Sequence, residues 1–312
     1  MSGIVVNTNI ASMNAQRSLM TSGAELKTAM ERLSTGYKIN SASDDAAGFA
    51  IAESMTAQVR GLSMAAKNAS DALGMLKVVE NATNDVTDML QRIRELAVQA
   101  QSGTNSVGDI ANLQQEAEAL IDEIGRVSED TKYNGKARLG ADAATLDIQV
   151  GYNDGDVIEV TTYNITPTGL GAVIDNTLTA TDTTDTVLHS LKNADGTYLD
   201  ISQVATAEVT DATSGAVTAV RVPGALEVIT SAIEQVAGYK AEWGAQQNRL
   251  EYTVSNLMNV VEFTTAARSR IQDADFAMEA AKLAKAQVLQ QTGTAMLAQA
   301  NAAPQLALQL IK

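Results

Sequence analysis

Cysteine is absent from this 312-residue chain, and the sequence contains only one histidine, three prolines and 4% aromatic residues. The absence of cysteine excludes disulfide bonds, thiolate metal sites and cysteine nucleophiles. The single histidine, His189, lies in a Thr- and Asp-rich stretch without neighbouring metal-ligand residues. We therefore interpret it as a solvated surface residue.

Motifs of catalysis and of membrane insertion are also missing. The sequence has no nucleophile elbow, phosphate-binding loop or cluster with metal-ligand spacing. We therefore expect no enzyme activity and no catalytic, cofactor-binding or metal-binding residues. No segment approaches the run of about 18 apolar residues that a membrane span requires. The start, MSGIVVNTNIASMNAQ, lacks the basic and long apolar regions of a cleavable secretory signal, so we expect none.

Negative charge is concentrated in the middle of the chain. The net charge is −15, and residues 141–222 alone carry 12 acidic and 2 basic side chains, whereas residues 1–43 and 271–312 are nearly neutral. This balance disfavours nucleic acid as a partner, because a basic patch is missing. We expect the neutral ends to pack together and the acidic middle to face solvent, since burying like charges side by side is costly.

Apolar residues recur at alternating spacings of three and four along three stretches, which is the pattern of a coiled-coil seam. In the longest stretch they are Leu226, Ile229, Ile233, Val236, Trp243, Leu250, Val254, Leu257, Val261 and Ile271. Polar residues interrupt it at Lys240, Gln247, Thr264 and Arg268. The second stretch is Met75, Val79, Ala82, Val86, Met89, Ile93, Leu96 and Ala100, and the third is Ile110, Leu113, Ala117, Leu120, Ile124 and Val127. Sustained heptads favour a helical bundle core over a cofactor-lining face.

These patterns predict helices over about 44–101, 109–130 and 226–271. The adjacent Asp44 and Asp45 could be a metal or acid–base pair, but an alanine-rich helix follows directly, so we interpret them as turn and cap residues. Apolar alternation over 145–150 and 157–161, across a Gly- and Asp-rich turn, predicts a β-hairpin. The Thr- and Asp-rich residues 177–221 predict a small, solvent-facing β-rich insert.

The two ends of the chain predict helices with thin apolar stripes. Residues 9–33 place Leu19, Leu26, Met30 and Leu33 on one face, and an Ala- and Gln-rich helix follows over 275–311. Neither stripe can bury itself, so the ends need each other and other copies of the chain. The predicted assembly core consists of Leu19, Leu26, Leu33, Leu283, Leu289, Met296 and Leu297.

Several long motifs resemble bacterial flagellin, in the order that this family has. They are LSTGYKINSASDDAAG at 33–48, LQRIRELAVQ at 90–99, ARSRIQDAD at 267–275, KAQVLQQ at 285–291 and LAQAN at 297–301. The resemblance covers about residues 1–165 and 223–312. It implies a secreted filament subunit of the bacterial flagellum, exported by the type III apparatus without a cleaved signal. It further implies an export chaperone and cap and junction proteins as partners.

The resemblance also implies recognition of the monomer by vertebrate Toll-like receptor 5. Arg92, Leu96 and Glu116 match the family's receptor-binding positions, and Gln91 and Glu95 flank them. The seam register puts Arg92, Glu95 and Glu116 off the apolar stripes and Leu96 on one. From periodicity alone, these residues are a solvated face and one core leucine.

The predicted fold is mainly α: a long antiparallel coiled-coil bundle with paired terminal helices, one β-hairpin and a small outward β-rich insert. We expect an inner domain from 1–43 and 272–312, a bundle-plus-hairpin domain from 44–176 and 222–271, and a variable outer insert from 177–221. The function expected first is a structural homopolymer used for swimming motility. A hook–filament junction protein is the nearest alternative, and an enzyme is the alternative from another class.

Overall fold

The computed structural model describes residues 9–171, 173–174, 188–189, 191–192, 196–203 and 224–310. It divides into two compact units, one built from Met1–Gly61 and Asn259–Lys312 and the other from Leu62–Met258. Most of the expected outer insert, and the side chain of His189, fall outside the described residues. In the part of the chain that is described, no helix combines the length and apolarity that crossing a bilayer requires.

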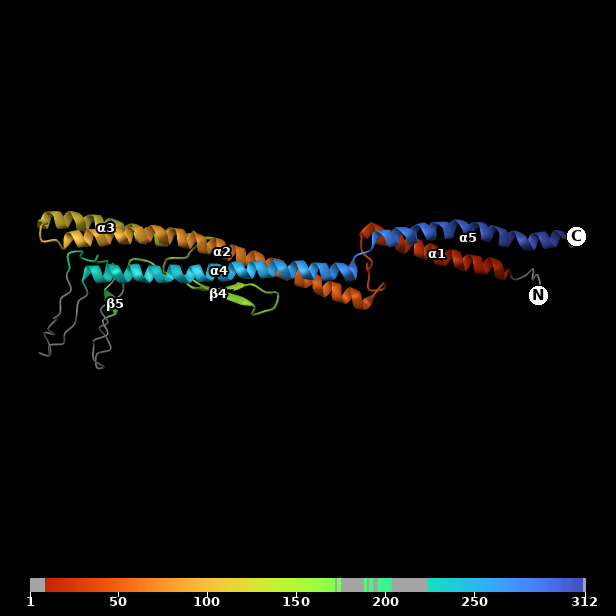
Figure 1. Cartoon of the computed structure of the whole chain (residues 1–312), viewed down its shortest axis with the longest axis horizontal. Helices are drawn as coiled ribbons and strands as arrows, with labels where there is room; N and C mark the ends of the chain where they lie inside the picture. The colour runs from red at the N-terminus through yellow and green to blue at the C-terminus, as the bar shows by residue number, and fades with distance from the viewer. Residues whose placement is uncertain are drawn as a thin grey trace, which may run out of the picture. The chain divides into compact units, whose positions relative to one another are not determined.

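The first unit is organised around two helices from opposite ends of the chain. Helix α1 (Ile10–Thr35) begins at Asn9, whose side chain accepts a hydrogen bond from the backbone N–H of Ser12, and ends at Gly36 with φ of 77°. Helix α5 (Phe276–Leu310) lies beside it (Figure 1). Asn9 bonds Ala300 at one end, and Arg32 bonds Glu279 at the other. The two terminal helices are therefore antiparallel, as the sequence predicted.

The links that join these helices to the rest of the chain are hydrogen-bonded to each other. The backbone N–H of Lys38 donates to the carbonyl of Gln272 at 2.7 Å, and that of Ala274 donates to the carbonyl of Gly36 at 2.9 Å. The next helix, α2 (Ala46–Ala100), is capped by Asp45, whose Oδ1 accepts from the N–H groups of Ala47 and Gly48.

Asp44 turns the chain into that helix, since its Oδ2 accepts from the backbone of Asn40 and Ser41. Those backbone hydrogen bonds lower the pKa of Asp44 below its usual value of 3.8. The interpretation of Asp44 and Asp45 as turn and cap residues is thus confirmed.

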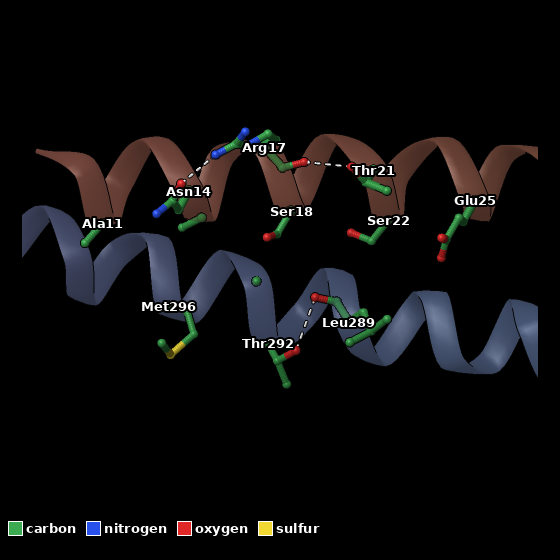
Figure 2. Close-up of a pocket in the computed structure, with 12 residues that line it drawn as sticks. Ala11, Asn14, Arg17, Ser18, Thr21, Ser22, Glu25, Leu289, Thr292 and Met296 are labelled. Carbon is green, nitrogen blue, oxygen red and sulfur yellow. Dashed lines mark hydrogen bonds between the residues drawn. The ribbon is translucent and has the colours of Figure 1, made fainter.

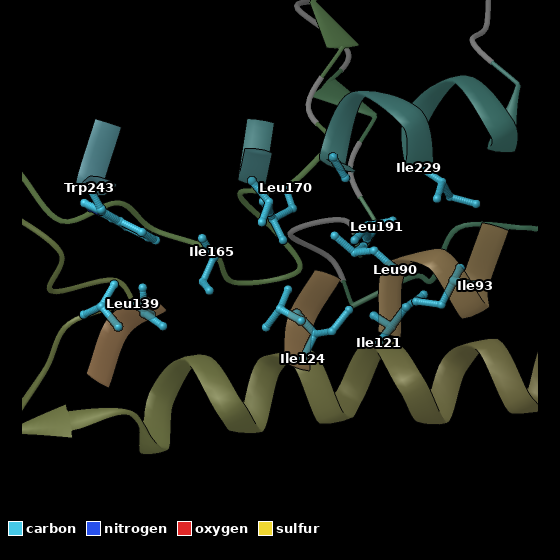
Figure 3. Close-up of a cluster of buried hydrophobic side chains, with 14 of the residues drawn as sticks. Leu90, Ile93, Ile121, Ile124, Leu139, Ile165, Leu170, Leu191, Ile229 and Trp243 are labelled. Atoms are coloured by element: carbon cyan, nitrogen blue, oxygen red, sulfur yellow. The ribbon is translucent and has the colours of Figure 1, made fainter. Parts of the chain in front are cut away.

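The second unit is a bundle of α3 (Val107–Asp130) with the parts of α2 and α4 (Ala225–Gln272) that lie within Leu62–Met258, and these helices lie side by side (Figure 1). A capping box between Ser106 and Asp109 starts α3. The largest fully buried side chains come from the helices and from the segments between them, and Figure 3 shows them meeting in one core. They include Leu76, Leu90, Ile93, Leu96, Ile121, Ile124, Leu139, Ile165, Leu170, Leu191, Ile201 and Trp243.

The predicted seam residues take part in this packing to different degrees. Met75, Val79, Val86, Ile93, Leu250 and Leu257 are buried, whereas Met89, Val254 and Val261 are half-buried. Ile121 lies outside the predicted stripe of α3 but is fully buried. The single apolar stripe predicted for α3 was too narrow, because a helix that packs against several elements buries more than one face.

Three polar residues that interrupt the α4 seam reach across to α2. Lys240 Nζ donates to Asn84 Oδ1 at 2.6 Å, and Gln247 Nε2 donates to Glu80 Oε2 at 2.9 Å. In the first unit, Arg268 donates to the hydroxyl of Thr56 at 3.2 Å. Such polar contacts within an apolar seam favour one register over its alternatives.

The β-structure consists of short antiparallel pairs. β3 (Thr145–Gln149) and β4 (Val157–Thr161) form the predicted hairpin, with Leu146 opposite Val160 and Ile148 opposite Ile158. A second hairpin, β1 (Lys132–Tyr133) with β2 (Lys136–Ala137), was not expected. β5 (Val173–Ile174) pairs with β6 (Leu188–His189), and β6 lies in the segment 177–221 that was expected to be β-rich. The fold is otherwise the predicted one, mainly α with small two-stranded sheets.

Part of the segment expected to face solvent lies in the core. Leu191 and Ile201 are fully buried, and Leu199 is 6% exposed. Gln114 of α3 holds this segment: its Nε2 donates to the carbonyl of Leu199, and its Oε1 accepts from the N–H of Ile201. Composition averaged over 177–221 concealed these few apolar residues, which explains why the expectation of solvent exposure was wrong for Leu191, Leu199 and Ile201.

Candidate assembly and recognition surfaces

The helices α1 and α5 meet along faces made mostly of small residues. On α1, the buried Ser12, Ser22 and Ala29 alternate at helical spacing with the half-buried Leu19, Leu26 and Leu33. On α5, a Cβ added to Gly293 would lie 3.1 Å from Leu19 Cδ1, so the backbone of α5 approaches α1 closely there. Met30 does not belong to this face, because it is 55% exposed.

Polar contacts fix the ends of this pairing. Asn9 Nδ2 donates to the carbonyl of Ala300 at 2.7 Å, and the hydroxyl of Ser12 donates to Asn301 Oδ1 at 2.7 Å. At the other end the carboxylate of Glu279, which is 4% exposed, contacts Lys282 Nζ at 2.8 Å and Arg32 at 3.4 Å. The Lys282 hydrogen bond and these two positive charges lower the pKa of Glu279.

A groove of about 690 Å³ runs between the two helices (Figure 2). Its α1 wall is polar and includes Asn14, Ser18 and Thr21, and Arg17 donates to Asn14 Oδ1 at 2.8 Å. On the α5 side, Leu289 and Met296 supply apolar surface. These two predicted assembly residues are 43% and 61% exposed. The groove therefore has a polar wall and an apolar wall, both open to a further side chain.

The predicted assembly residues fall into two groups. Leu19, Leu26, Leu33, Leu283 and Leu297 are half-buried at or beside the contact between α1 and α5, whereas Leu289 and Met296 face outward. Further large apolar side chains are exposed on the same helices, and the predicted assembly core did not include them. They are Ile10, Met13, Met20, Met30, Phe276, Met278 and Val288. So much exposed apolar surface on one helix pair indicates an interaction surface.

A second surface brings together residues of α2 and α3. Arg92 Nε donates to Glu116 Oε1 at 3.0 Å and its NH1 donates to Glu95 Oε2 at 3.0 Å. All three side chains are about half exposed or more, and Gln91 beside them is also exposed. The hydrogen bonds from Arg92 to Glu95 and then to Glu116 raise the pKa of Arg92. The predicted outward positions are thus joined by ion pairs that cross between helices.

Leu96 lies elsewhere, because it is 1% exposed and packs in the bundle core. Gln91, Arg92, Glu95 and Glu116 are therefore accessible at this surface, while Leu96 supports the helix from within. Next to them a shallow groove of about 590 Å³ is lined by Gln91, Glu95 and Ile233, among others.

Among the residues that the structure describes, no three His, Asp or Glu side chains are grouped so that they could hold a metal ion. What the two surfaces can do chemically is bind: the terminal pair through apolar contact, and the Arg92 surface through charge and hydrogen bonds.

Comparison with known proteins gives matches along almost the whole chain. The family model described as bacterial flagellin N-terminal helical region matches residues 6–143, and that of the bacterial flagellin C-terminal helical region matches residues 226–311. A flagellin of Halalkalibacterium halodurans is 37% identical over 99% of this chain and 100% of its own length. A flagellin of Bacillus subtilis is 39% identical over 98% and 99%. The crystal structure of Bacillus cereus flagellin aligns at 22% identity with a TM-score of 0.42, covering 61% of this chain and 88% of that one.

Proposed function

This chain belongs to the bacterial flagellin family, whose members polymerise as the structural subunit of the flagellar filament, and we propose that its copies join through α1 and α5. The observation that carries this proposal is the exposed apolar surface of the terminal helix pair. Met20 is 76% exposed and Met296 is 61% exposed on helices that otherwise pair through small residues. Contacts between unlike faces that repeat without closing generate a helical fibre.

A pair of matched substitutions tests this assignment. Met296→Glu places a charge on the apolar wall of the groove, so burying it against another copy is costly and polymerisation should fail. Val107→Glu makes the same type of change at an 86% exposed position at the start of α3, where polymerisation should persist. Seeded elongation of purified monomers, measured by sedimentation, compares the two variants. Equal polymerisation by both would contradict the assignment of the interface to α1 and α5.

Removing residues 275–312 provides a more severe test. The sole tryptophan, Trp243, lies in the other compact unit and reports whether the bundle remains folded. We expect the truncated chain to keep a buried Trp243 fluorescence spectrum but to form no filaments in electron micrographs. Normal filaments from this chain would refute a need for α5.

The organisation of the subunit follows from the same proposal. Residues 1–43 and 272–312 are the inner domain, residues 44–176 and 222–271 are the bundle-plus-hairpin domain, and 177–221 is the outer insert, anchored through its buried leucines. The subunit is exported by the flagellar type III apparatus with a dedicated chaperone, meets cap and junction proteins, and forms an extracellular filament used for swimming. A strain that lacks the chain should lose filaments and swimming, and the chain itself should restore both.

The alternative within flagellar architecture is a hook–filament junction protein. The full-length similarity to flagellins favours the filament subunit, since this chain covers 100% of the Halalkalibacterium halodurans relative. A junction protein would form a short assembly of fixed length. The length of fibres grown from purified monomers therefore separates the two functions, because a filament subunit elongates in proportion to the monomer supplied.

A second candidate function is recognition of the monomer by Toll-like receptor 5 of a vertebrate host. The supporting observation is that Arg92, Glu95 and Glu116 form one exposed, ion-paired surface across α2 and α3. A receptor can replace these exposed ion pairs with its own charge-assisted hydrogen bonds at little cost, because exposed pairs contribute little to stability. Polymerisation would cover this surface, so the monomer is the form recognised.

The double variant Arg92→Ala/Glu116→Ala tests this role against a matched control. Arg126→Ala/Glu123→Ala removes another exposed ion pair, formed within α3, with the same change of charge. We expect the first variant to lose receptor signalling and the control to keep it, with the helicity of both variants unchanged. Equal signalling by the two folded variants would exclude the Arg92 surface as the receptor site.

A further inference from the structure

Methionine is concentrated on the exposed faces of the terminal helices. Five of the eleven methionines, Met13, Met20, Met30, Met278 and Met296, lie on α1 and α5 with between 55% and 76% of their surface exposed. Met13 and Met20 are seven residues apart, and Met278 and Met296 are eighteen apart, so each pair lies along one face of its helix. The thioether is therefore a repeated feature of the proposed assembly surface.

Methionine suits a surface that must fit another copy, because its unbranched chain and polarizable sulfur adapt to irregular contacts. Figure 2 shows Met296 and Leu289 on the α5 side of the groove with Thr292 between them, and a side chain entering the groove would contact the sulfur of Met296. In the free monomer the same sulfur is open to solvent. The thioethers on this surface are thus exposed in the free chain, and assembly through α1 and α5 would cover them.

Among the other residues that the structure describes, few side chains compete for an oxidant. Cysteine is absent, and the sole tryptophan, Trp243, is fully buried. Met75 is 3% exposed, and Met55 and Met89 are half-buried. In the second unit, Met64 and Met258 are exposed to a similar degree, 56% and 62%, and serve as internal controls.

We propose that Met13, Met20, Met30, Met278 and Met296 form an oxidation-sensitive modification site, at which sulfoxide formation stops the monomer from joining other copies. The inference rests on the proposed function, since it requires α1 and α5 to be the interface. The oxidant is a hydroperoxide. Its O–O bond breaks, one oxygen forms an S=O bond, the sulfur loses two electrons, and hydrogen peroxide is reduced to water.

A sulfoxide changes the chemistry of the interface while leaving the helix backbone intact. The oxygen is a strong hydrogen-bond acceptor, and covering it with apolar side chains of another copy removes its water without supplying a donor. We expect the critical concentration for polymerisation to rise about tenfold or more, because burying an unpaired polar group weakens the contact between copies by at least that factor. The effect is reversible, because the two methionine sulfoxide reductases, one for each sulfoxide epimer, use two thiols to convert the sulfoxide back to the thioether and water, and the thiols are oxidised to a disulfide. The chain has no cysteine that the thiol could alter.

The test compares three proteins as monomers obtained by depolymerising filaments. They are the parent chain, a variant with all five residues changed (M13L, M20L, M30L, M278L and M296L), and the control M64L/M258L. Each is treated with hydrogen peroxide, sulfoxides are located by peptide mass spectrometry, and seeded polymerisation is compared with that of its own untreated sample. Leucine is close to methionine in volume but cannot accept oxygen.

The parent and M64L/M258L should lose polymerisation after peroxide, and the two reductases with a thiol should restore it. The five-leucine variant should keep its own untreated level. Intact filaments of the parent should form sulfoxides at the five sites much more slowly than monomers do.

Two results would overturn the inference: oxidised parent monomers that polymerise normally, or oxidised parent monomers that the reductases do not rescue. Rescue of the oxidised parent by the reductases tests the inference even if the five-leucine variant polymerises poorly before peroxide treatment. A failure of Met296→Glu to impair assembly would instead contradict the proposed interface itself.

Discussion

Gln114 clamps the segment 199–201 onto α3 at two points. Its Nε2 donates to the carbonyl of Leu199 at 3.1 Å, and its Oε1 accepts from the N–H of Ile201 at 3.0 Å. Both residues that it holds are buried, at 6% and 0% exposure. Gln114→Ala removes both hydrogen bonds and leaves two backbone groups in a poorly solvated position.

The size of the effect follows from those two contacts. Each hydrogen bond contributes about 1 kcal/mol, and leaving a buried backbone group unpaired costs about 1–3 kcal/mol. We therefore expect Gln114→Ala to lower the free energy of unfolding of the bundle by about 2–4 kcal/mol. Gln115→Ala is the matched control, because Gln115 is exposed on the next position of the same helix. It should change the stability by less than about 0.5 kcal/mol.

Urea unfolding followed by Trp243 fluorescence measures this difference. Trp243 is fully buried and its Nε1 donates to the carbonyl of Thr161 at 2.9 Å, so its emission reports on the bundle core. With a urea dependence of about 2 kcal/mol per molar, Gln114→Ala should unfold at about 1–2 M less urea than the parent. Midpoints for Gln114→Ala and Gln115→Ala that agree within error would refute the clamp.

Three further perturbations have signs that the structure determines. Gly23→Ala should stabilise α1 by about 0.5–1 kcal/mol, because nothing lies within 4 Å of the added Cβ. Gly48→Ala should destabilise α2, because its added Cβ would lie 2.7 Å from Ile39 Cδ1. The melting temperatures of the two variants should therefore shift in opposite directions. Glu279 has a lowered pKa, so its contribution to α1–α5 pairing is complete above the usual glutamate value of 4.5 and is lost as pH falls through the lowered folded value. Helicity measured by circular dichroism during acid titration should depend on pH less steeply in Glu279→Gln than in the parent. Gln247→Glu should cost about 1 kcal/mol, because it replaces a hydrogen bond to Glu80 with like-charge repulsion; a melting temperature equal to the parent's would contradict that contact.

The helices were predictable from the sequence because their signals are local. Heptad spacing identified α2, α3 and α4, and the cap residue Asn9 and the turn residues before Ala46 marked where two helices begin. The hairpin of β3 and β4 was equally clear from its alternation. A local signal for β1 and β2 also existed and was overlooked: Asn134 and Gly135 both have positive φ, and Asn-Gly favours this two-residue turn.

Contacts between distant segments were not predictable in the same way. The pairing of Lys240 with Asn84 depends on the register between two helices, which a spacing pattern does not define. The contact face of α1 contains Ser12, Ser22 and Ala29, which no apolar stripe identifies. Leu191 and Ile201 are buried, although their own neighbours in the sequence are polar. Their backbone N–H groups bond distant residues, Leu170 and the side chain of Gln114 respectively.

The same distinction between local signals and distant contacts holds for the candidate sites. Periodicity predicted that Arg92, Glu95 and Glu116 lie off the apolar stripes and that Leu96 lies on one, and their exposure agrees with this. It did not predict that Arg92 bridges α2 and α3, because that contact requires the two helices to be aligned. Among the exposed methionines of the terminal helices, the sequence had placed Met296 in the assembly core and Met30 on an apolar face. Met13, Met20 and Met278 were not singled out, since a thin stripe on an isolated helix does not reveal which face its partner leaves open.

The hydrogen bonds between the links that follow α1 and precede α5 restrict how the length of this protein can change. Lys38 bonds Gln272, and Ala274 bonds Gly36, so the end of α1 and the start of α5 are held together at one point. One residue inserted into α1 rotates everything beyond it by about 100° and moves it by about 1.5 Å relative to that point. Seven inserted residues restore the facing side chains to within about 20°. Natural insertions and deletions in the terminal helices should therefore occur in sevens, or as matched changes in both helices.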